Sequence, residues 1–378
     1  MSDRQAIAKA ASDGLRLFAA SIDQRPVLVG FDGFVDSIIH IVDKRYDAER
    51  FDRVPTISDF GSRISAAAGQ SSNVELVTTV RKLGGNGPIM ANALASVGFP
   101  TTYIGALGLP AVDPVFDEFA KLATVHSIAD PGFTDALEFE DGKLMLGKHD
   151  AIRDLSQDAI DEHVGRNAYE GICLHAKLIA MVNWTMLPGM NGIWRHLIDH
   201  VLPELDGNRM VFIDLADPAK RTDDDLRAAM ALAGELQQDT DVVLGFNLSE
   251  ATQVASVLGI KVPEDAEPAI EETAAALRES IGVHCVVVHP RRGAAGAIQT
   301  NDGVVTATFA GPFVKKPKLS TGAGDNFNAG FCTGLLAGLP LEQALCTGTG
   351  VSGFYVREGR SPTLGELADF CADLPAPQ

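Results

Sequence analysis

One short segment of the sequence combines residues suited to bind a phosphoryl group with a residue suited to accept a proton. Small residues fill positions 320–324, and Asp325 follows in the first turn of a predicted helix. The unpaired N–H groups of Gly322, Ala323 and Gly324 at a helix N-terminus can surround an anion, and glycine allows a close approach. The neighbouring carboxylate can take the proton of a hydroxyl that attacks phosphorus. The segment predicts phosphoryl transfer to an alcohol, with a helix cap and tight turn as the alternative.

A second candidate pair, Asn247 and Glu250, follows an apolar run in the sequence GFNLSEAT. Oxygen ligands suit a hard cation such as Mg²⁺, which usually keeps several waters. Glu250 is therefore a predicted magnesium ligand, directly or through water. The alternative is that Asn247 and Ser249 only start a helix.

Two aspartates, Asp32 and Asp36, follow the first predicted strand in GFDGFVDSII. Carboxylates accept two hydrogen bonds, which suits the neighbouring hydroxyls of a sugar. A glycine-rich segment containing Gly85 and Asn86 leads into a predicted helix with Pro88 in its first turn. Both segments are candidate sugar-binding sites, and turn capping and a plain glycine-rich turn are their alternatives.

The sequence STGAGDNF, residues 320–327, resembles the second signature of the ribokinase-like, or phosphofructokinase B, family of carbohydrate and nucleoside kinases. The resemblance implies that the glycine-rich loop forms an anion hole and that Asp325 is the catalytic base. The segment around Gly85 and Asn86 is similar to the first signature, whose residues contact the sugar. The family's substrate-binding aspartate matches Asp36 best, and Asp32 is a second match.

The resemblance extends to the nucleotide side of the predicted site. The spacing of Asn247 and Glu250 is similar to a family motif that organises magnesium, water and the transferred phosphate. Further positions that the resemblance places beside the nucleotide or its phosphates are Arg221, Gly293, Gly296 and Thr321.

Two positions depart from the family pattern. Leu319 stands where the family often has an aspartate, in a stretch that helps to bind a monovalent cation in several members, so the resemblance leaves potassium activation open. Ile89 stands where the family usually has an asparagine that contacts the sugar, so that contact is either missing or supplied by Asn92.

Short apolar runs alternate with helical patterns and imply βαβ units around a largely parallel sheet. The runs span 26–30, 178–183, 210–215, 242–247 and 283–289. Ligands bind beyond the carboxyl ends of parallel strands, so the polar residues that end four of these runs are expected to line one crevice. These residues are Asn183, Asp214, Asn247 and His289.

An Asp-Gly pair at 141–142 predicts one hairpin, and another at 302–303 predicts a hairpin at the edge of the sheet. The resemblance implies a ribokinase-like α/β fold with three layers, a central mostly parallel sheet and a small β lid. The chain is expected to form a single domain over 1–378, with an N-terminal helix at about 1–24 and lid elements at about 36–60 and 132–150.

Three glycines recur every fourth residue in the helix that follows Asp325. Each glycine inside a helix costs about 1 kcal/mol relative to alanine. The spacing of Gly330, Gly334 and Gly338 therefore predicts close packing against another backbone.

Composition restricts the classes of function. The 50 acidic and 31 basic residues give a formal net charge of -19, which disfavours nucleic acids and anionic membranes as partners. The five cysteines lack a C-x-x-C pair, which favours reduced thiols. The N-terminus is typical of an amphipathic helix rather than a signal peptide, and no apolar run reaches the roughly 18 to 20 residues of a membrane span. A cytoplasmic location is expected.

The sequence thus predicts a kinase that uses ATP and Mg²⁺ to phosphorylate a hydroxyl of a small sugar. Two alternatives stay open: a nucleoside kinase, and a catalytically weak sugar- or nucleotide-binding regulator on the same fold. Some family members pair through the lid, so a homodimer is a further expectation. The chain lacks G-x-G-x-x-G after its first strand and lacks G-x-x-x-x-G-K-[ST], which argues against dinucleotide-dependent oxidoreductases and P-loop enzymes.

Overall fold

The apolar runs that the sequence predicts as strands lie next to one another in the structure. Strands β1 (Val27–Phe31), β9 (Leu178–Met181), β10 (Met210–Asp214), β11 (Asp241–Phe246) and β12 (Cys285–Val288) pair in parallel in that order. Nearly all of their residues are buried. Strands covered on both faces are apolar along their whole length, which explains the continuous runs.

The computed structural model describes residues 2–205, 207, 209–263 and 269–378. Its central sheet has nine strands in the order β14-β13-β12-β11-β10-β9-β1-β5-β6. On one side it continues in parallel with β5 (Thr101–Ala106) and β6 (Thr124–Ala129). On the other side β13 (Gly293–Thr300) and β14 (Gly303–Ala310) form an antiparallel hairpin. The hairpin predicted at the edge of the sheet is confirmed.

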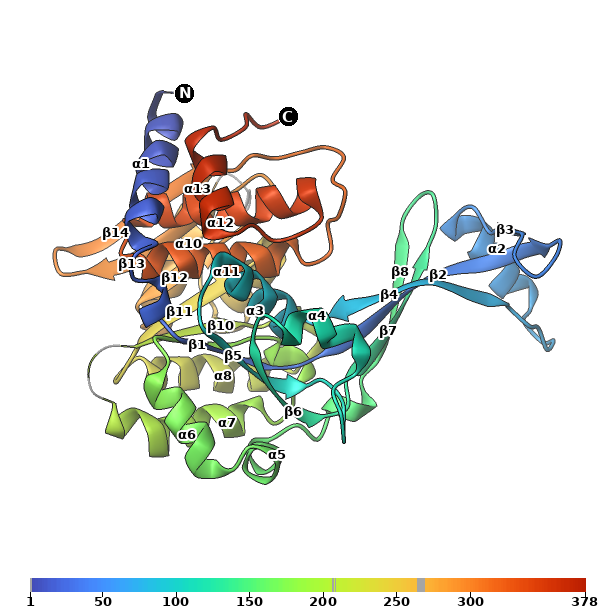
Figure 1. The fold of residues 1–378 in the computed structure, drawn as a ribbon, viewed down its shortest axis with the longest axis horizontal. Helices are drawn as coiled ribbons and strands as arrows, with labels where there is room; N and C mark the ends of the chain where they lie inside the picture. The colour runs from blue at the N-terminus through green and yellow to red at the C-terminus, as the bar shows by residue number, and fades with distance from the viewer. Residues whose placement is uncertain (1, 206, 208, 264–268) are drawn as a thin grey trace.

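Helices cover both faces of this sheet, so the predicted three-layer arrangement is confirmed (Figure 1). One face carries α1 (Ser2–Phe18), α3 (Asn86–Val97), α4 (Asp117–Ala120), α11 (Ala323–Leu336), α12 (Leu341–Glu358) and α13 (Leu364–Ala372). The other carries α5 (Gln157–His163), α6 (Arg166–His175), α7 (Met190–His196), α8 (Asp223–Leu236), α9 (Leu248–Leu258) and α10 (Ile270–Ile281).

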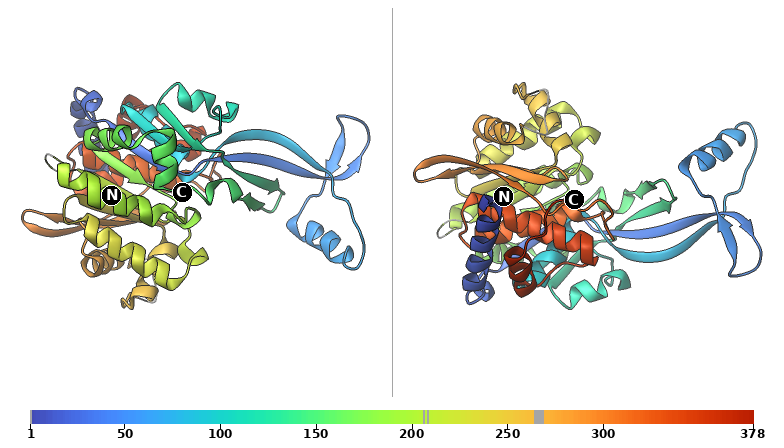
Figure 2. Two further views of the ribbon diagram at one scale, coloured as in Figure 1. Left: turned by 90° about the horizontal axis from the view of Figure 1, so that it is seen from below. Right: turned by 90° about the horizontal axis from the view of Figure 1, so that it is seen from above.

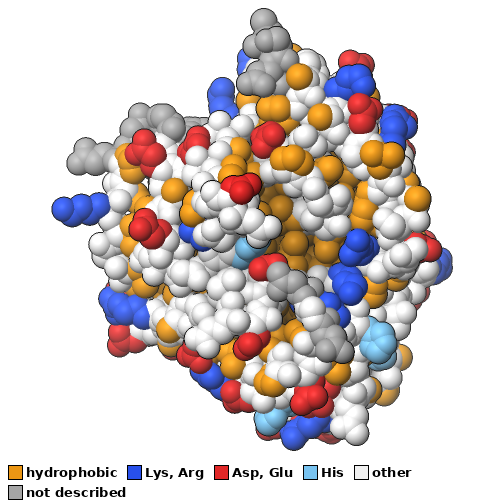
Figure 3. All heavy atoms as spheres, turned by 90° about the vertical axis from the view of Figure 1, so that its left-hand side faces the viewer, with side chains coloured by type: hydrophobic (Ala, Val, Ile, Leu, Met, Phe, Trp, Pro, Cys, Tyr) orange, Lys and Arg blue, Asp and Glu red, His pale blue; other side chains and the backbone are white. Residues whose placement is uncertain are grey.

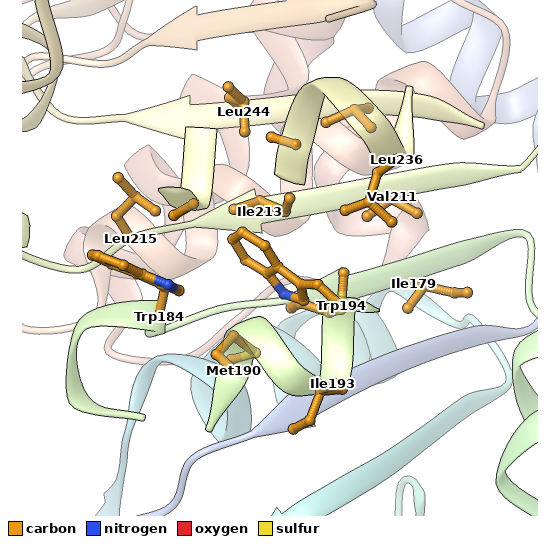
Figure 4. Packing of buried hydrophobic residues seen from close by; sticks show 14 of the residues in the cluster. Ile179, Trp184, Met190, Ile193, Trp194, Val211, Ile213, Leu215, Leu236 and Leu244 are labelled. Atoms are coloured by element: carbon orange, nitrogen blue, oxygen red, sulfur yellow. The ribbon is translucent and has the colours of Figure 1, made fainter. Parts of the chain in front are cut away.

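Each helical layer encloses its own hydrophobic cluster against the sheet. In the second layer, Trp194 of α7 lies beside Val211 and Ile213 of β10, and all three are fully buried (Figure 4). The five cysteines are buried and free, as predicted. No helix in the described part of the chain is both long and apolar enough to cross a membrane.

A second, five-stranded sheet extends from the body as an arm with α2 near its tip (Figures 1 and 2). The arm contains β2 (Phe34–Arg45), β3 (Phe51–Arg53), α2 (Ile57–Ala66), β4 (Leu76–Gly84), β7 (Gly132–Glu138) and β8 (Lys143–Lys148). Strands β7 and β8 form the hairpin predicted at 141–142.

The elements of the arm and the first helix differ in extent from the sequence prediction. The expected lid elements, 36–60 and 132–150, omitted β4, because most of its residues are exposed and show no buried, apolar face. Helix α1 ends at Phe18 rather than near 24, and residue 1 lies outside the described residues. The Ser21 hydroxyl donates to the Phe18 carbonyl and satisfies one of the groups left open at this helix end.

Two of the three regularly spaced glycines behave as predicted. A Cβ atom at Gly330 would lie 2.5 Å from the carbonyl oxygen of Thr347 in α12, and one at Gly334 would lie 2.4 Å from the Thr347 hydroxyl oxygen. The prediction is wrong for Gly338, which has no atom within 4 Å of its Cβ position. Gly338 follows the end of α11 with a φ of 71°, a left-handed conformation that favours glycine.

We predict that Gly330→Ala destabilises the fold, because the added methyl group would collide with backbone that cannot move independently. The free energy of unfolding, measured by urea denaturation, should fall by about 1–3 kcal/mol. Gly171→Ala in α6 is the matched control, since its Cβ position has no neighbour within 4 Å. That variant should gain up to about 1 kcal/mol from helix propensity. Equal effects of the two substitutions would contradict the packing argument.

Candidate active site

Two cavities, each with a volume of ≈ 440 Å³, lie beyond the carboxyl ends of the central strands. Four residues line both cavities: Asn86, Ala216, Glu250 and Asp325. Three of the four polar strand ends predicted to line one crevice share a cavity. Asp214, Asn247 and His289 line the first cavity, and Asn183 lines the second.

The N-terminus of α11 faces this junction. Gly322 precedes the helix with a φ of 86°, which lets the chain turn sharply into it. The N–H group of Ala323 donates to the Ser320 carbonyl at 3.2 Å, closing a turn. Within the described part of the chain, the N–H groups of Gly322 and Gly324 make no backbone hydrogen bond. Of the three amides expected to bind an anion, the structure therefore leaves these two open.

Asp325 lies in the first turn of α11 and is 8% exposed. The side-chain amide of Asn86, at the start of α3, donates to its Oδ1 at 2.8 Å. Burial raises the pKa of Asp325 to about 8, and the nearby carboxyl groups of Asp32 and Glu250 add to the shift. The Asn86 hydrogen bond opposes it. A carboxyl group in this state is a stronger base than an exposed aspartate.

Glu250 holds a strained loop against the junction. Its Oε2 accepts from the N–H of Asn247 at 2.9 Å, completing a capping box at the start of α9. Its Oε1 accepts from the N–H of Asp217 at 3.0 Å. Ala216 and Asp217 both have left-handed φ values, 56° and 61°, which are unfavourable for residues other than glycine. Helix capping, the alternative considered for this motif, is thus one of its roles.

Asp214 brings a further carboxyl group to the same cavity. Its Oδ2 accepts from the side-chain amide of Asn328 at 2.8 Å. Burial raises the pKa of Asp214 well above its ordinary value, and Glu250 and Asp325 add to the shift. Across the described residues, no group of three or more His, Cys, Asp and Glu side chains has the arrangement of a metal site.

Asp36 and Asp32 occupy different positions. Asp36 lines the second cavity and Asp32 does not. The Asp32 carboxylate is fully buried and accepts from the N–H groups of Asn86 and Gly87, at 3.0 and 2.7 Å, and from the Asn183 amide at 2.6 Å. Asp32 therefore caps the start of α3, which agrees with the alternative role of turn capping.

The glycines before α3 make room for these two carboxylates. A Cβ atom at Gly84 would come within 2.5 Å of the Asp36 carboxyl group. Cβ atoms at Gly85 and Gly87 would lie 3.0 and 2.7 Å from the Asp32 carboxylate. Gly85 also has a φ of 95°. The glycine-rich segment can therefore pack against the buried carboxyl groups of Asp36 and Asp32, and this position lets Asn86 reach Asp325.

Other predicted residues are divided between the cavities and the framework. Gly293 lines the first cavity and Thr321 the second. Gly296 lies within β13, where a Cβ atom would meet Leu341 at 3.2 Å, and it lines neither cavity. Arg221 also lines neither. Its guanidinium stacks on Trp184, 4.3 Å from the ring centroid, and binds Asp225.

Sequence reasoning missed several residues of the second cavity. Thr134 and His149 come from the arm, and Lys220 comes from the loop after β10. None of them lies in a glycine-rich or acidic motif, so no local signal marks them. Ile89, one of the departures from the family pattern, also lines this cavity and packs beside Gly322.

A family model for prokaryotic ketohexokinases matches residues 3–374. The chain belongs to the prokaryotic ketohexokinase family. A ketohexokinase from Haloferax volcanii is 31% identical over 354 residues, which cover 93% of this chain and 92% of the relative. Membership of this family of sugar kinases makes the chain a phosphotransferase with an alcohol as acceptor, as predicted.

Solved structures show that the ketohexokinase family member has the predicted ribokinase-like fold. Arabidopsis thaliana ribokinase, complexed with ribose and ATP, superposes with a TM-score of 0.63 at 17% identity, covering 92% of this chain and 99% of its own. A phosphofructokinase-2 mutant from Escherichia coli gives a TM-score of 0.63 at 16% identity, covering 93% and 99%.

We predict that Asp325→Asn changes how stability depends on pH in this ketohexokinase family member. The folded pKa of about 8 exceeds the ordinary value of 3.8, so folded protein keeps a proton that unfolded protein loses. This contribution to stability is full below about pH 4 and is lost as pH rises through 8. The free energy of unfolding should be measured by urea denaturation in EDTA at pH 5 and at pH 9. The difference between variant and wild type should shift in favour of the variant by more than about 1 kcal/mol over this range.

The control for this measurement is Asp302→Asn, in the exposed turn between β13 and β14. Its pH profile should run parallel to that of wild type. A parallel profile for Asp325→Asn would mean that the Asp325 carboxyl group is not held in the environment described.

Proposed function

We propose that the chain transfers the γ-phosphoryl group of ATP to a hydroxyl of a ketohexose. The observation that carries the proposal is the position of Asp325, where the two cavities meet at the N-terminus of α11. A nucleotide in one cavity and a sugar in the other would present phosphorus and hydroxyl to the same carboxylate. The family and the Haloferax relative support a ketohexose as the sugar class.

The first cavity suits a nucleotide because its lining combines apolar and anion-binding parts. Pro312, Phe313 and Val356 supply apolar surface, and Gly324 belongs to the start of α11. We propose that the purine ring of the nucleotide packs on this apolar surface. The phosphates would bind the open N–H groups at the start of α11, helped by the helix dipole. The proposed place of action is the cytoplasm, which supplies ATP and keeps thiols reduced.

The second cavity suits an uncharged polyol better than a sugar phosphate. Four carboxyl groups line it, from Asp36, Asp217, Glu250 and Asp325, against the single ammonium group of Lys220 among the described lining residues. Like charges repel more strongly where water is partly excluded. The Asp36 carboxylate and the Asn86 amide are suited to bind hydroxyl groups.

The residues at the junction fit a hard divalent cation. The carboxyl groups of Asp214 and Glu250 line the first cavity, and within the described residues neither forms an ion pair with lysine or arginine. We propose that they hold Mg²⁺, and because both oxygens of Glu250 accept backbone N–H groups, Glu250 would act through water. When bound, Mg²⁺ neutralises charge on the phosphates.

In the proposed reaction, Asp325 accepts the proton of the sugar hydroxyl. Asn86 donates to Oδ1 of Asp325 and so fixes the orientation of the carboxylate, leaving its other oxygen for the sugar hydroxyl. A base with a pKa near the working pH accepts the hydroxyl proton as the oxygen attacks phosphorus. The amides at the start of α11 stabilise the charge on the migrating group.

We predict that Asp325→Asn lowers kcat with a ketohexose by two orders of magnitude or more, the scale expected for loss of a general base. Nucleotide affinity, measured by calorimetry, should stay within a few-fold of wild type, because the amide keeps the shape of the carboxyl group. ADP release should be measured over ketohexoses, aldoses, nucleosides and sugar phosphates, in sodium and in potassium salts. Asp302→Asn is again the control.

The panel also decides between the two alternative functions. Preferred turnover of nucleosides would replace the sugar assignment with that of a nucleoside kinase. Tight binding of sugar and nucleotide by wild type without ADP release would identify a regulator. Near-normal turnover by Asp325→Asn would remove the proposed base.

We propose in addition that two copies pair through the arm. Its strands, α2 and the segment before β4 expose large apolar side chains: Ile64, Val74, Leu76, Val80, Phe133, Met145 and Leu146. The arm extends away from the body, so its strands are accessible to a partner (Figure 2). On the face of the body opposite to the arm, acidic and basic side chains are interspersed among the apolar ones (Figure 3). Exposed apolar side chains in such number on one part of a protein are typical of an interface with another chain.

We predict that wild type has the mass of a dimer in light scattering and that Val80→Glu shifts it toward the monomer. A charged group in an apolar interface lacks a partner and weakens association. Val304→Glu is the matched control, because Val304 and Val80 are both 51% exposed but Val304 lies on β14. A monomeric wild type would contradict the proposed pairing.

A further inference from the structure

His149, directly after β8, lines the second cavity together with Asp36, Asn86 and Asp325. It belongs to none of the motifs that mark the nucleotide or phosphate side of the site. The residue is half-buried, and its ring makes no hydrogen bond to any residue that the structure describes. An imidazole that lines a carboxylate-rich cavity, and whose nitrogens have no hydrogen-bond partner among the described residues, needs an explanation.

The surrounding residues hold the ring in one place. The Phe34 ring meets it edge-on, with centroids 5.4 Å apart and planes at 89°. On its other side, Nε2 lies over Gly147, so close that a Cβ atom there would be 2.2 Å away. Gly147 does not have a positive φ, so backbone conformation does not call for glycine. Glycine is needed here because a side chain would occupy the space of the imidazole.

The strand register places this ring on the same face of the sheet as Asp36, with Thr134 between them. Gly147 on β8 pairs with Thr134 on β7, and Thr134 pairs with Asp36 on β2. Directly paired residues share one face of a sheet, with Cβ atoms about 4.5–5.5 Å apart. The Thr134 hydroxyl lies near enough to the Asp36 carboxyl group to oppose the rise in its pKa that burial causes. The Asp36 carboxylate, the Thr134 hydroxyl and the imidazole above Gly147 therefore form a row on the face that lines the cavity.

The charge state of the ring suits a hydroxyl rather than a phosphate. Burial lowers the pKa of His149, and the positive charges of Lys220 and Arg153 lower it further, while Asp150 opposes them. The imidazole is therefore neutral near pH 7. A neutral imidazole carries one donor and one acceptor, the combination that a sugar hydroxyl complements.

We propose that His149 is a specificity-determining residue that binds a sugar hydroxyl next to the one presented to Asp325. The inference rests on the proposed sugar kinase function and deepens it. His149 and Asp36 form the arm's side of the sugar site, and Asn86 and Asp325 form the side that belongs to the body. Gly147 and Phe34 act through His149 as positioning residues.

The test compares three variants with fructose, a representative ketohexose, as the probe. His149→Phe removes both nitrogens but keeps a ring, and should raise KM for fructose about tenfold, the effect of one lost hydrogen bond. The kcat value and the KM for ATP should stay within about threefold of wild type. His149→Gln, whose amide can reach the same hydroxyl, should restore most of the affinity. Gly147→Ala leaves His149 in the sequence but displaces its ring, and should raise KM for fructose in the same way.

Lys148→Ala is the control, because Lys148 lies on the same hairpin, pairs with Asp135 at 2.8 Å and does not line the cavity. Fructose affinity should also be measured by calorimetry without nucleotide, which reports on the site independently of turnover. Wild-type affinity for fructose in His149→Phe would overturn the proposal. Equal increases of both KM values, or no recovery in His149→Gln, would mean that the ring only supports the fold. If wild type phosphorylates no sugar but binds fructose through His149, the proposed function fails and this contact stands.

Discussion

The hydrogen bond from the Asn86 amide to the Asp325 carboxylate is the constraint on which the rest of the site depends. It joins the N-termini of α3 and α11, whose residues lie 239 positions apart in the chain. Bringing two helix N-termini together concentrates partial positive charge, and buried carboxylates compensate for it. Asp32 binds the first N–H groups of α3, and Asp325 lies in the first turn of α11. The junction between the cavities is the space left beside this contact.

Close approach at the junction requires residues without side chains, which is why glycine concentrates there. At Gly84, Gly85 and Gly87 a Cβ atom would overlap the Asp36 or Asp32 carboxyl group or approach it within 3.0 Å. In the arm, Gly147 leaves space for His149 in the same way. The glycines thus position charged and polar side chains by leaving space for them, in addition to allowing unusual backbone angles.

The sequence predicted the parts of the molecule that depend on local patterns. The central strands were recognisable because burial on both faces makes them continuously apolar, and the loop before Asp325 was recognisable because an anion site on a helix N-terminus needs small residues. Strand β4 was missed because exposure removes the apolar pattern. His149 and Lys220 were missed because the register of the arm and the path of a loop, rather than spacing in the chain, bring them to the cavity. The different roles of Asp36 and Asp32 were missed for the same reason. Three hydrogen bonds from distant parts of the chain hold Asp32 in the framework, and only the fold brings these donors to it.

The accumulation of acids at the junction also bears on how substrates enter. Asp214, Glu250 and Asp325 raise one another's pKa or are raised by burial, so the empty site resists further negative charge. The open amides at the start of α11 attract phosphate, but they are dipoles, and their effect falls off within one turn. The negative charges of a nucleotide would raise the pKa values of these carboxyl groups further, unless a cation entered with it and favoured their ionised form. The electrostatics of the junction therefore agree with the proposal that the nucleotide binds together with Mg²⁺ and that the sugar is uncharged.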